Sequence, residues 1–554
     1  MTGRTGGVVI LLDPAVRATG LDPGALAAAV GAGREAVVRQ VPGLARGPAR
    51  AGEAARSAAA ARAVLVTAEY GDPTLAELRS RVADWGLDPL GVHCVALDVL
   101  ASGRSPAEQA GYAVRLVTAG LAALAASGES AAARRALGSA LSRRGLLTGR
   151  MTTWVPVAAV AGEACLGSAR CGRCLPACPV AALTQGPNHG QAPAVDPAAC
   201  TACGRCVASC PVGALRLDGL DPGPLGRRLT ALLDGGADEL PAPALVFACQ
   251  SIVGLAHRAG RRRGSGGWLP VALPHVAGLG TGWLLAALAA GARAVGVLPC
   301  SQCRSDPVVA ERVEFVRALL GGLGDGAGAA RAGVLPDSST EVAGRLAAAG
   351  QLAPLCPPVA GASGPLADLA PGRDASLAAW AVTRLAAALA ALTPAPEPTR
   401  RSSTAAPRRG SGPGTVVTGA GSPLGLVAAR VGGCTGCGAC TLACPGEALV
   451  IRHEGPPHER RTLVVFDPAS CDTCRLCVSA CPEQVLQATA ATDVRALRDG
   501  PVVIAVSTGG RACPTCGQDI LVLPAARLPA GLPTPLMQKC PTCRVEALTG
   551  SALT

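Results

Sequence analysis

The sequence of 554 residues is poor in aromatic residues and nearly without lysine. Phe, Trp and Tyr together make up 2% of the chain, and Lys539 is the only lysine among 50 lysines and arginines. This bias toward arginine indicates a GC-rich genome. Around the carboxyl-terminal cysteines, no aromatic residue alternates with a basic patch, as happens in proteins that bind single-stranded nucleic acid. We therefore expect no nucleic-acid partner.

Long apolar runs are missing as well. The longest, residues 276–292, is shorter than the roughly 18 residues that indicate a transmembrane helix, and it is rich in Gly and Ala. It predicts a buried helix instead. The first apolar run, residues 8–12, ends at Asp13 and is too brief for the apolar core of a signal peptide. We expect neither a transmembrane segment nor an export signal.

A nucleotide-binding glycine loop is also absent. Residues 417–425, VTGAGSPLG, imitate one, but a true dinucleotide fingerprint leaves a strand, opens a helix and belongs to a complete βαβ unit. The cysteine run that begins at Cys434 leaves no room for that unit. We interpret the stretch as a turn that leads into a strand of the following module. Neither flavin nor nicotinamide binding is expected.

Cysteine, by contrast, is abundant, and most of the 25 cysteines lie in four runs of one pattern. Three runs read C-x2-C-x2-C-x3-C-P, and the first run differs only in an opening gap of five residues. This is the spacing of bacterial [4Fe-4S] ferredoxins. A disulfide framework gives no reason for one spacing to recur. The runs are Cys165, Cys171, Cys174 and Cys178; Cys200, Cys203, Cys206 and Cys210; Cys434, Cys437, Cys440 and Cys444; and Cys471, Cys474, Cys477 and Cys481.

The four runs form two pairs, and each pair resembles the two-cluster bacterial ferredoxin family. In that family the fourth cysteine of a run binds the cluster of the neighbouring run. We therefore predict four [4Fe-4S] clusters with crossed ligand sets. The predicted sets are Cys165, Cys171, Cys174 and Cys210; Cys200, Cys203, Cys206 and Cys178; Cys434, Cys437, Cys440 and Cys481; and Cys471, Cys474, Cys477 and Cys444.

The cysteine content also bears on charge and compartment. The formal net charge of +12 ignores ligated thiolates. Four all-cysteine clusters contribute about −8, and a divalent ion on four thiolates about −2 more, so the loaded protein is near neutral. So many unpaired thiols favour a reducing compartment, and we expect a cytoplasmic protein.

Residues 6–140 alternate short apolar runs with Ala- and Leu-rich helical stretches, the βαβ pattern of a parallel sheet. We expect strands at 8–12, 63–67 and 92–97 and a helix near 110–124. Cys94 lies inside a strand-like run, where a small buried side chain is expected. The segment ARAVLVTAEYGDPTLAELRSRVADWGLDPLGVHCVALDVL resembles the amino-terminal region of the heterodisulfide reductase A subunit. Ala68-Glu69-Tyr70 stands where that family has a cysteine, which implies a scaffold without metal.

A second α/β region spans residues 241–392. Expected strands at 244–248, 269–273 and 294–298 end near Cys249, His275 and the Cys300-Ser-Gln-Cys303 stretch. Because ligands gather at the carboxyl ends of parallel strands, Cys249, His275, Cys300 and Cys303 could converge on one metal.

This region, FACQSIVGLAHRAG through LPHVAGLGTGWLLAALAAGARAVGVLPCSQCR, resembles the delta (iron-sulfur) subunit of methyl-viologen-reducing hydrogenase. The resemblance implies a [2Fe-2S] centre at the strand ends. Here Ile252 stands where a second early cysteine is expected, and His275 replaces a cysteine. Three thiolates and one imidazole suit [2Fe-2S] or Zn. The alternative is a domain that kept the fold and lost the metal.

The carboxyl-terminal part contains two CxxC pairs, Cys513/Cys516 and Cys540/Cys543. Paired knuckles of this kind build a tetrahedral four-thiolate site, for which Zn is the default ion. The knuckles also look like those of rubredoxin, so a single Fe is the alternative. We predict a zinc-ribbon-like element. Residues 393–414, rich in Pro, Ser, Gly and Arg, are predicted to be a flexible linker.

The predicted fold is multi-domain, α/β and α+β, in which parallel-sheet (flavodoxin-like) domains alternate with two ferredoxin-like modules. The expected segments are 1–145 (α/β without a metal motif), 150–220 (first ferredoxin module), 241–392 (α/β), 393–414 (linker), 415–490 (second ferredoxin module) and 500–554 (α/β remnant with the four-cysteine site).

Clusters bound entirely by cysteine leave no iron open to substrate, so their natural task is one-electron transfer. We predict an electron-transfer component of an oxidoreductase complex of the hydrogenase or heterodisulfide-reductase type. Its expected partners are hydrogenase, formate dehydrogenase, heterodisulfide-reductase-like or flavoprotein subunits. One alternative is an iron-sulfur thiol/disulfide reductase that uses Cys249, Cys300 and Cys303. The other is a redox-sensing or nucleic-acid-binding regulator that uses the zinc ribbon.

Overall fold

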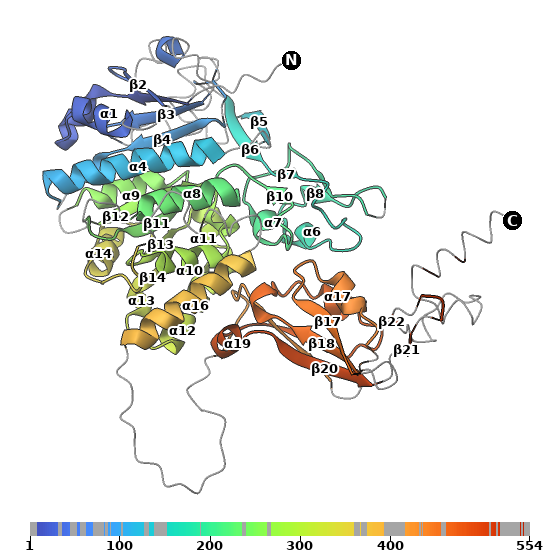
Figure 1. Cartoon of the computed structure of the whole chain (residues 1–554). Helices are drawn as coiled ribbons and strands as arrows, with labels where there is room; N and C mark the ends of the chain where they lie inside the picture. The colour runs from blue at the N-terminus through green and yellow to red at the C-terminus, as the bar shows by residue number, and fades with distance from the viewer. Residues whose placement is uncertain are drawn as a thin grey trace, which may run out of the picture. The chain divides into compact units, whose positions relative to one another are not determined.

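The computed structural model describes most of the chain. The described residues are 8–31, 36–44, 52–55, 62–69, 82, 87–88, 90–100, 104–126, 132–137, 152–188, 190–234, 240–262, 267–358, 366, 374–392, 416–430, 434, 436–455, 461–508, 511–512, 514–516, 519–520, 543 and 547. The chain divides into two compact units (Figure 1). The first contains Met1–Leu377 and Arg384–Pro394, and the second contains Ala378–Thr383 and Ala395–Thr554. The predicted linker, 393–414, lies outside the described residues.

The amino-terminal part of the first unit is a parallel sheet in the order β2-β1-β3-β4, as the βαβ pattern predicts. The three expected strands are confirmed, with ends that differ by at most one residue. The helix α4 covers β3 and β4 and extends further at both ends than predicted. The elements are β1 (Val8–Leu12), η1 (Pro14–Thr19), α1 (Pro23–Gly31), β2 (Val37–Gln40), β3 (Arg62–Thr67), β4 (Val92–Ala96), η2 (Asp98–Leu100) and α4 (Pro106–Ala126).

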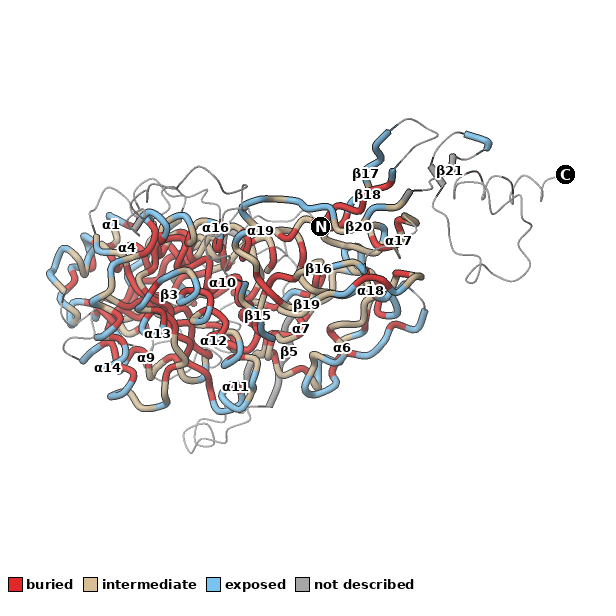
Figure 2. Tube along the Cα trace, turned by 90° about the horizontal axis from the view of Figure 1, so that it is seen from below, coloured by how far each residue is buried: buried red, intermediate tan, exposed pale blue. Residues whose placement is uncertain are grey.

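A second parallel sheet, in the order β12-β11-β13-β14, forms the other α/β part of this unit. Every residue of β11 is buried, which agrees with the continuous apolar runs typical of parallel sheets. The predicted buried helix is confirmed, since every residue of α10 is buried (Figure 2). The elements are β11 (Ala244–Cys249), α9 (Val253–Gly260), β12 (Trp268–Leu273), η3 (Val276–Gly278), α10 (Thr281–Ala289), β13 (Val295–Leu298), α11 (Ser301–Arg304), α12 (Pro307–Gly322), α13 (Gly328–Arg331), β14 (Ala332–Val334), α14 (Ser339–Gly350) and α16 (Asp374–Leu392).

Buried polar contacts join the two α/β parts. The Asp98 carboxylate lies 2.7 Å from His257 Nδ1 and 3.1 Å from an Arg261 nitrogen. Helix α8 (Pro222–Leu233) packs along α4, and its Arg228 donates to the Ala272 carbonyl at 2.9 Å. A buried carboxylate needs such partners, because an unpaired buried charge is costly. The contacts therefore fix the two sheets in one unit.

The first ferredoxin module is built from short elements and belongs to the same unit. Two small antiparallel pairs, β7 with β10 and β8 with β9, frame the short helices α6 and α7. Another pair, β5 with β6, crosses the predicted boundary between the first domain and this module. The elements are β5 (Ala132–Leu137), β6 (Thr152–Val157), β7 (Ala159–Val160), α6 (Cys174–Ala177), β8 (Leu183–Thr184), β9 (Ala194–Val195), α7 (Arg205–Ala208) and β10 (Leu215–Arg216).

The second unit contains the second ferredoxin module, with two three-stranded antiparallel sheets in the orders β15-β19-β16 and β17-β18-β20. The chain passes from β15 through a turn into β16 without a helix, so the predicted turn at 417–425 is confirmed. Strand β20 pairs with β18, so this sheet continues past the predicted boundary at residue 490. The elements are β15 (Val416–Thr418), β16 (Gly425–Ala429), α17 (Ala439–Ala443), β17 (Leu449–Glu454), β18 (Arg461–Phe466), η4 (Pro468–Ser470), α18 (Leu476–Ala480), β19 (Leu486–Asp493), α19 (Val494–Asp499), β20 (Val502–Thr508), β21 (Arg511–Ala512) and β22 (Asp519–Ile520).

Among the helices that the structure describes, none is both long enough and apolar enough to cross a bilayer.

Candidate metal centres

The four cysteine runs share two backbone positions in the left-handed region. The first directly follows the second cysteine of each run, and the second lies three residues after the fourth cysteine. At these turns successive N–H groups can point to the same side and form a concavity that suits an anion such as a cluster with four thiolates. The first position is Gly172, Gly204, Gly438 and Arg475, with φ of 57°, 74°, 73° and 61°; the second is Ala181, Gly213, Glu447 and Gln484, with φ of 49°, 62°, 53° and 52°.

The turn after the fourth cysteine also directs an N–H group at its sulfur. The amide of Ala182 donates to Cys178 Sγ, and the amide of Ala214 donates to Cys210 Sγ, both at 3.2 Å. Hydrogen bonds to sulfur stabilise a thiolate and help to set the reduction potential of a cluster. In the first module the αL position after the fourth cysteine thus places an amide against its sulfur atom.

Two pockets show how the runs combine. One pocket is lined by the first three cysteines of the second run, Cys200, Cys203 and Cys206, together with Cys178 from the first run. The cysteines of the equivalent pocket in the second module are Cys444, Cys471, Cys474 and Cys477. In each pocket the fourth cysteine of one run meets the first three of its partner.

In the other two predicted sets, cysteines of paired runs raise one another's pKa, which shows that the paired runs lie close together. Burial and then the nearby Cys210 raise the pKa of Cys174 to about 11. Burial and then Cys437, Cys434, Cys477 and Cys481 raise the pKa of Cys440 to about 12. Thiols this close do not all ionise unless a cation lies between them. All eight cysteines from Cys434 to Cys481 are free thiols, as the binding of a metal core requires.

The carboxyl-terminal four-cysteine site is only partly described. Cys516 is exposed and Cys543 is buried, while Cys513 and Cys540 lie outside the described residues.

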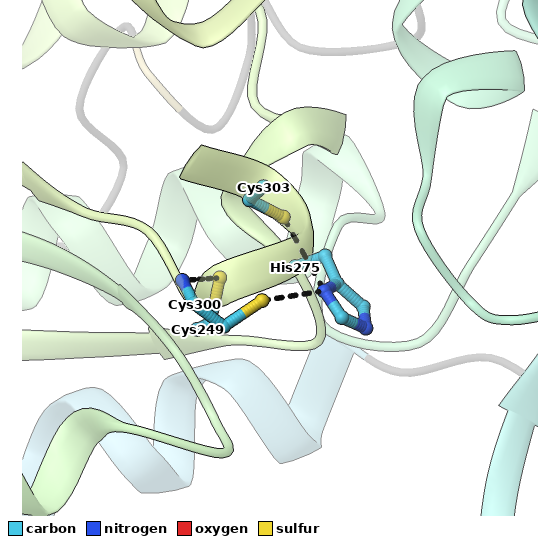
Figure 3. Close-up of side chains that lie close together, drawn as sticks. All are labelled: Cys249, His275, Cys300 and Cys303. Atoms are coloured by element: carbon cyan, nitrogen blue, oxygen red, sulfur yellow. Dashed lines mark hydrogen bonds between the residues drawn. The ribbon is translucent and has the colours of Figure 1, made fainter. Parts of the chain in front are cut away.

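The middle α/β part brings Cys249, His275, Cys300 and Cys303 together at the carboxyl end of its sheet (Figure 3). Cys249 is the last residue of β11, His275 lies two residues after β12, and Cys300 lies two residues after β13. Cys303 is contributed by α11. The four ligand atoms lie within 4.8 Å of one another.

These four side chains shift one another's pKa. Burial would lower the pKa of His275, but the neighbouring thiols of Cys249 and Cys300 outweigh it and raise that pKa to about 9. Hydrogen bonds from Cys249 and Cys303 lower the pKa of Cys300, whereas the same network raises the pKa of Cys303.

The first ferredoxin module lies directly against this part of the sheet. Arg205 of α7 forms an ion pair with Asp306 at 3.2 Å, and α7 contacts η3, the turn that follows His275. A methyl group on Gly278 would lie 2.9 Å from Gly204 Cα and 3.1 Å from the Cys203 carbonyl oxygen. The loop that carries Cys203 and the turn next to His275 are thus in backbone contact.

Comparison with known proteins supports the interpretation of the cysteine runs as iron-sulfur ligands. Residues 165–214 and 433–485 each match the family described as the 4Fe-4S dicluster domain. The chain therefore contains two segments that match iron-sulfur dicluster domains. A 54-residue segment is 39% identical to one subunit of the Na(+)-translocating ferredoxin:NAD(+) oxidoreductase complex of Acetobacterium woodii. That match covers 10% of this chain and 14% of the relative.

Sequence reasoning missed the contact between the first module and η3. The sequence offers only a weak signal for this contact, because Gly204 and Gly278 do not stand out among the 71 glycines of the chain. The αL positions had a partial signal, since a glycine follows the second cysteine in three of the four runs and Arg475 takes that place in the fourth.

Proposed function

We propose that the chain is an electron-transfer subunit that passes single electrons through four [4Fe-4S] clusters within a redox complex. The observation that carries this proposal is the composition of the two pockets. Each is lined by three cysteines of one run and the fourth cysteine of its partner run. This is the crossed ligand arrangement of a two-cluster ferredoxin.

The proposed ligands are the sixteen cysteines of the four runs. Clusters with four cysteine ligands expose no iron to a substrate, so electrons enter and leave through partner proteins. Two clusters that exchange their fourth ligands are held side by side, which makes each module a short path for electrons. Two modules therefore suit a relay between partners.

The proposed partners are other redox subunits of a cytoplasmic assembly of the hydrogenase or heterodisulfide-reductase type. Hydrogenase, formate dehydrogenase, heterodisulfide-reductase-like and flavoprotein subunits are the candidates. The resemblances of the two α/β regions support this choice. The name of the Acetobacterium woodii relative also describes a redox complex. For the carboxyl-terminal cysteines we propose one Zn ion, with a single Fe as the alternative.

Direct thiol/disulfide reduction at the middle site is less well supported. A thiolate must reach the disulfide it attacks. Cys249 is 0% exposed, Cys300 6% and Cys303 2%. These sulfur atoms are poorly placed to meet a substrate, so electron transfer through the clusters is the function that we favour.

Crossed ligation can be tested by pairwise Cys→Ser variants in the full chain, with iron measured after anaerobic reconstitution. Loss of one cluster removes about four of about sixteen Fe. Cys178 and Cys203 belong to one predicted set, so Cys178→Ser with Cys203→Ser should lose no more iron than either variant alone. Cys178→Ser with Cys171→Ser should lose about twice as much, because two clusters are affected.

The matched control is Cys356→Ser, since Cys356 is a buried free thiol outside the four runs. It should keep all the iron. The opposite pattern, with additive loss for the Cys178 and Cys203 pair and no additivity for the Cys178 and Cys171 pair, would show uncrossed ligation. A colourless wild-type chain would contradict the proposed function itself.

A further inference from the structure

The middle site has the dimensions of a single tetrahedral metal centre. Zn–S bonds of about 2.3 Å and Zn–N bonds of about 2.0–2.1 Å give tetrahedral sulfur–nitrogen edges of about 3.6 Å and sulfur–sulfur edges of about 3.8 Å. His275 Nδ1 lies 3.3 Å from Cys303 Sγ and 3.5 Å from Cys300 Sγ. No two of the four ligand atoms are more than 4.8 Å apart. The atoms therefore surround one point.

A two-iron cluster fits this arrangement less well. In [2Fe-2S] the four protein ligands are divided between two irons, so the two pairs must stand farther apart than the corners of one tetrahedron. Here His275 lies between Cys300 and Cys303 and contacts both sulfur atoms (Figure 3). The same nitrogen approaching two thiols is what a shared central ion produces.

The surroundings of Cys249 also suit a metal-bound thiolate. The amides of Val276 and Cys300 both donate to Cys249 Sγ at 3.3 Å. Such bonds orient a sulfur ligand and stabilise its charge. Three thiols converge here in a nearly dry interior, and none of them is in a disulfide. If these thiols are ionised, they need a cation, because an unpaired buried charge is costly.

We propose that Cys249, His275, Cys300 and Cys303 bind one zinc ion. Three thiolates and an imidazole form a closed tetrahedral donor set, which is typical of structural zinc. The ion joins the ends of β11, β12 and β13 and holds the turn η3, against which the Cys203 loop rests. Zinc is not redox-active, so it carries no electrons. Its role is to stabilise the turn on which the loop of the neighbouring cluster packs. This inference does not depend on the number of clusters.

The test measures zinc, iron and acid-labile sulfide per full-length chain after anaerobic purification. His275→Ala and Cys303→Ser are each expected to lose one zinc per chain relative to the wild type. His275→Cys supplies a thiolate in place of the imidazole and should keep the ion. Cys356→Ser is the control for a buried cysteine outside the site and should also keep it.

Cobalt in place of zinc gives a readout that depends on the ligands. After loading with Co²⁺, the wild-type chain should show more tetrahedral d–d absorption than His275→Ala. The difference should correspond to one tetrahedral Co²⁺ ion per chain. The proposal is overturned if His275→Ala and Cys303→Ser lose two irons and two sulfides with zinc unchanged, because the centre would then be binuclear. It is equally overturned if both folded variants keep every metal and the two cobalt spectra coincide.

Discussion

The contact between Gly278 and the Cys203 loop leads to a sharp prediction for Gly278→Ala. The added methyl group would lie 2.9 Å from Gly204 Cα and 3.1 Å from the Cys203 carbonyl oxygen, and it would also clash with Leu220 Cδ1. Leu220 is 4% exposed and has little room to move. Two of the three obstacles are backbone atoms, so the loop and the turn must separate.

The magnitude follows from overpacking, which costs about 1–3 kcal/mol for an extra methyl group in a tight interior. In domains of 150–250 residues 1 kcal/mol shifts the melting temperature by about 2–4 °C, and less in larger ones, so we expect a decrease of about 2–6 °C. The cysteines are unchanged, so the iron content should stay at the wild-type level.

The matched control is Gly344→Ala. Gly344 is an exposed residue inside α14, and a methyl group there would meet nothing within 4 Å. Alanine favours a helix over glycine by about 1 kcal/mol, so this variant should melt at or above the wild-type temperature.

The assay is thermal unfolding of the reconstituted full chain, followed by circular dichroism at one fixed scan rate, because such unfolding is often irreversible. The transition of the second unit serves as an internal reference. If Gly278→Ala melted like the wild type while Gly344→Ala behaved as expected, the cluster loop would not rest on η3. The account of how the first module is seated would then be wrong.

Three further predictions concern single residues. Arg475 occupies the αL position that is glycine in the other three runs, so Arg475→Gly should stabilise the second unit by about 1 kcal/mol, seen as a higher melting temperature. Arg205→Ala removes a partly exposed ion pair with Asp306 and should cost no more than about 1 kcal/mol, a difference that added salt should reduce. Burial, and then Asp218, raise the pKa of Asp221 to about 6, so its ionised form destabilises the fold above that pH. Asp221→Asn should therefore stabilise the chain by at most about 2 kcal/mol near pH 7.5. The gain in stability should shrink as the pH falls from about 6 to 4. A gain that grew on acidification would contradict the raised pKa of Asp221.

The sequence predicted the fold well where a pattern was local. Apolar runs predicted three of the four strands in each parallel sheet, because buried parallel strands need apolar residues on both faces, whereas the edge strands β2 and β14 were not predicted. The carboxyl ends of the predicted strands also indicated which residues meet at the middle site. Cys249, His275 and Cys300 each follow or end a strand of the same sheet, so their convergence could be expected from topology alone.

Long-range features were harder to predict. That β20 joins the sheet of the second module depends on its pairing with β18 across about forty residues, and no local pattern encodes that pairing. The packing of the first module on η3 depends on Gly204 and Gly278, which lie close together although they are far apart in the sequence. The number of metal ions in the middle site depends on the distances between the four ligand atoms, which cysteine spacing does not determine.

Iron and acid-labile sulfide per chain, measured on anaerobically reconstituted full-length protein, test the central claim most directly. Four cubanes predict about sixteen Fe and about sixteen sulfides. About half of these values would mean that only one of the two modules binds its clusters. A colourless chain with neither iron nor sulfide would contradict the account.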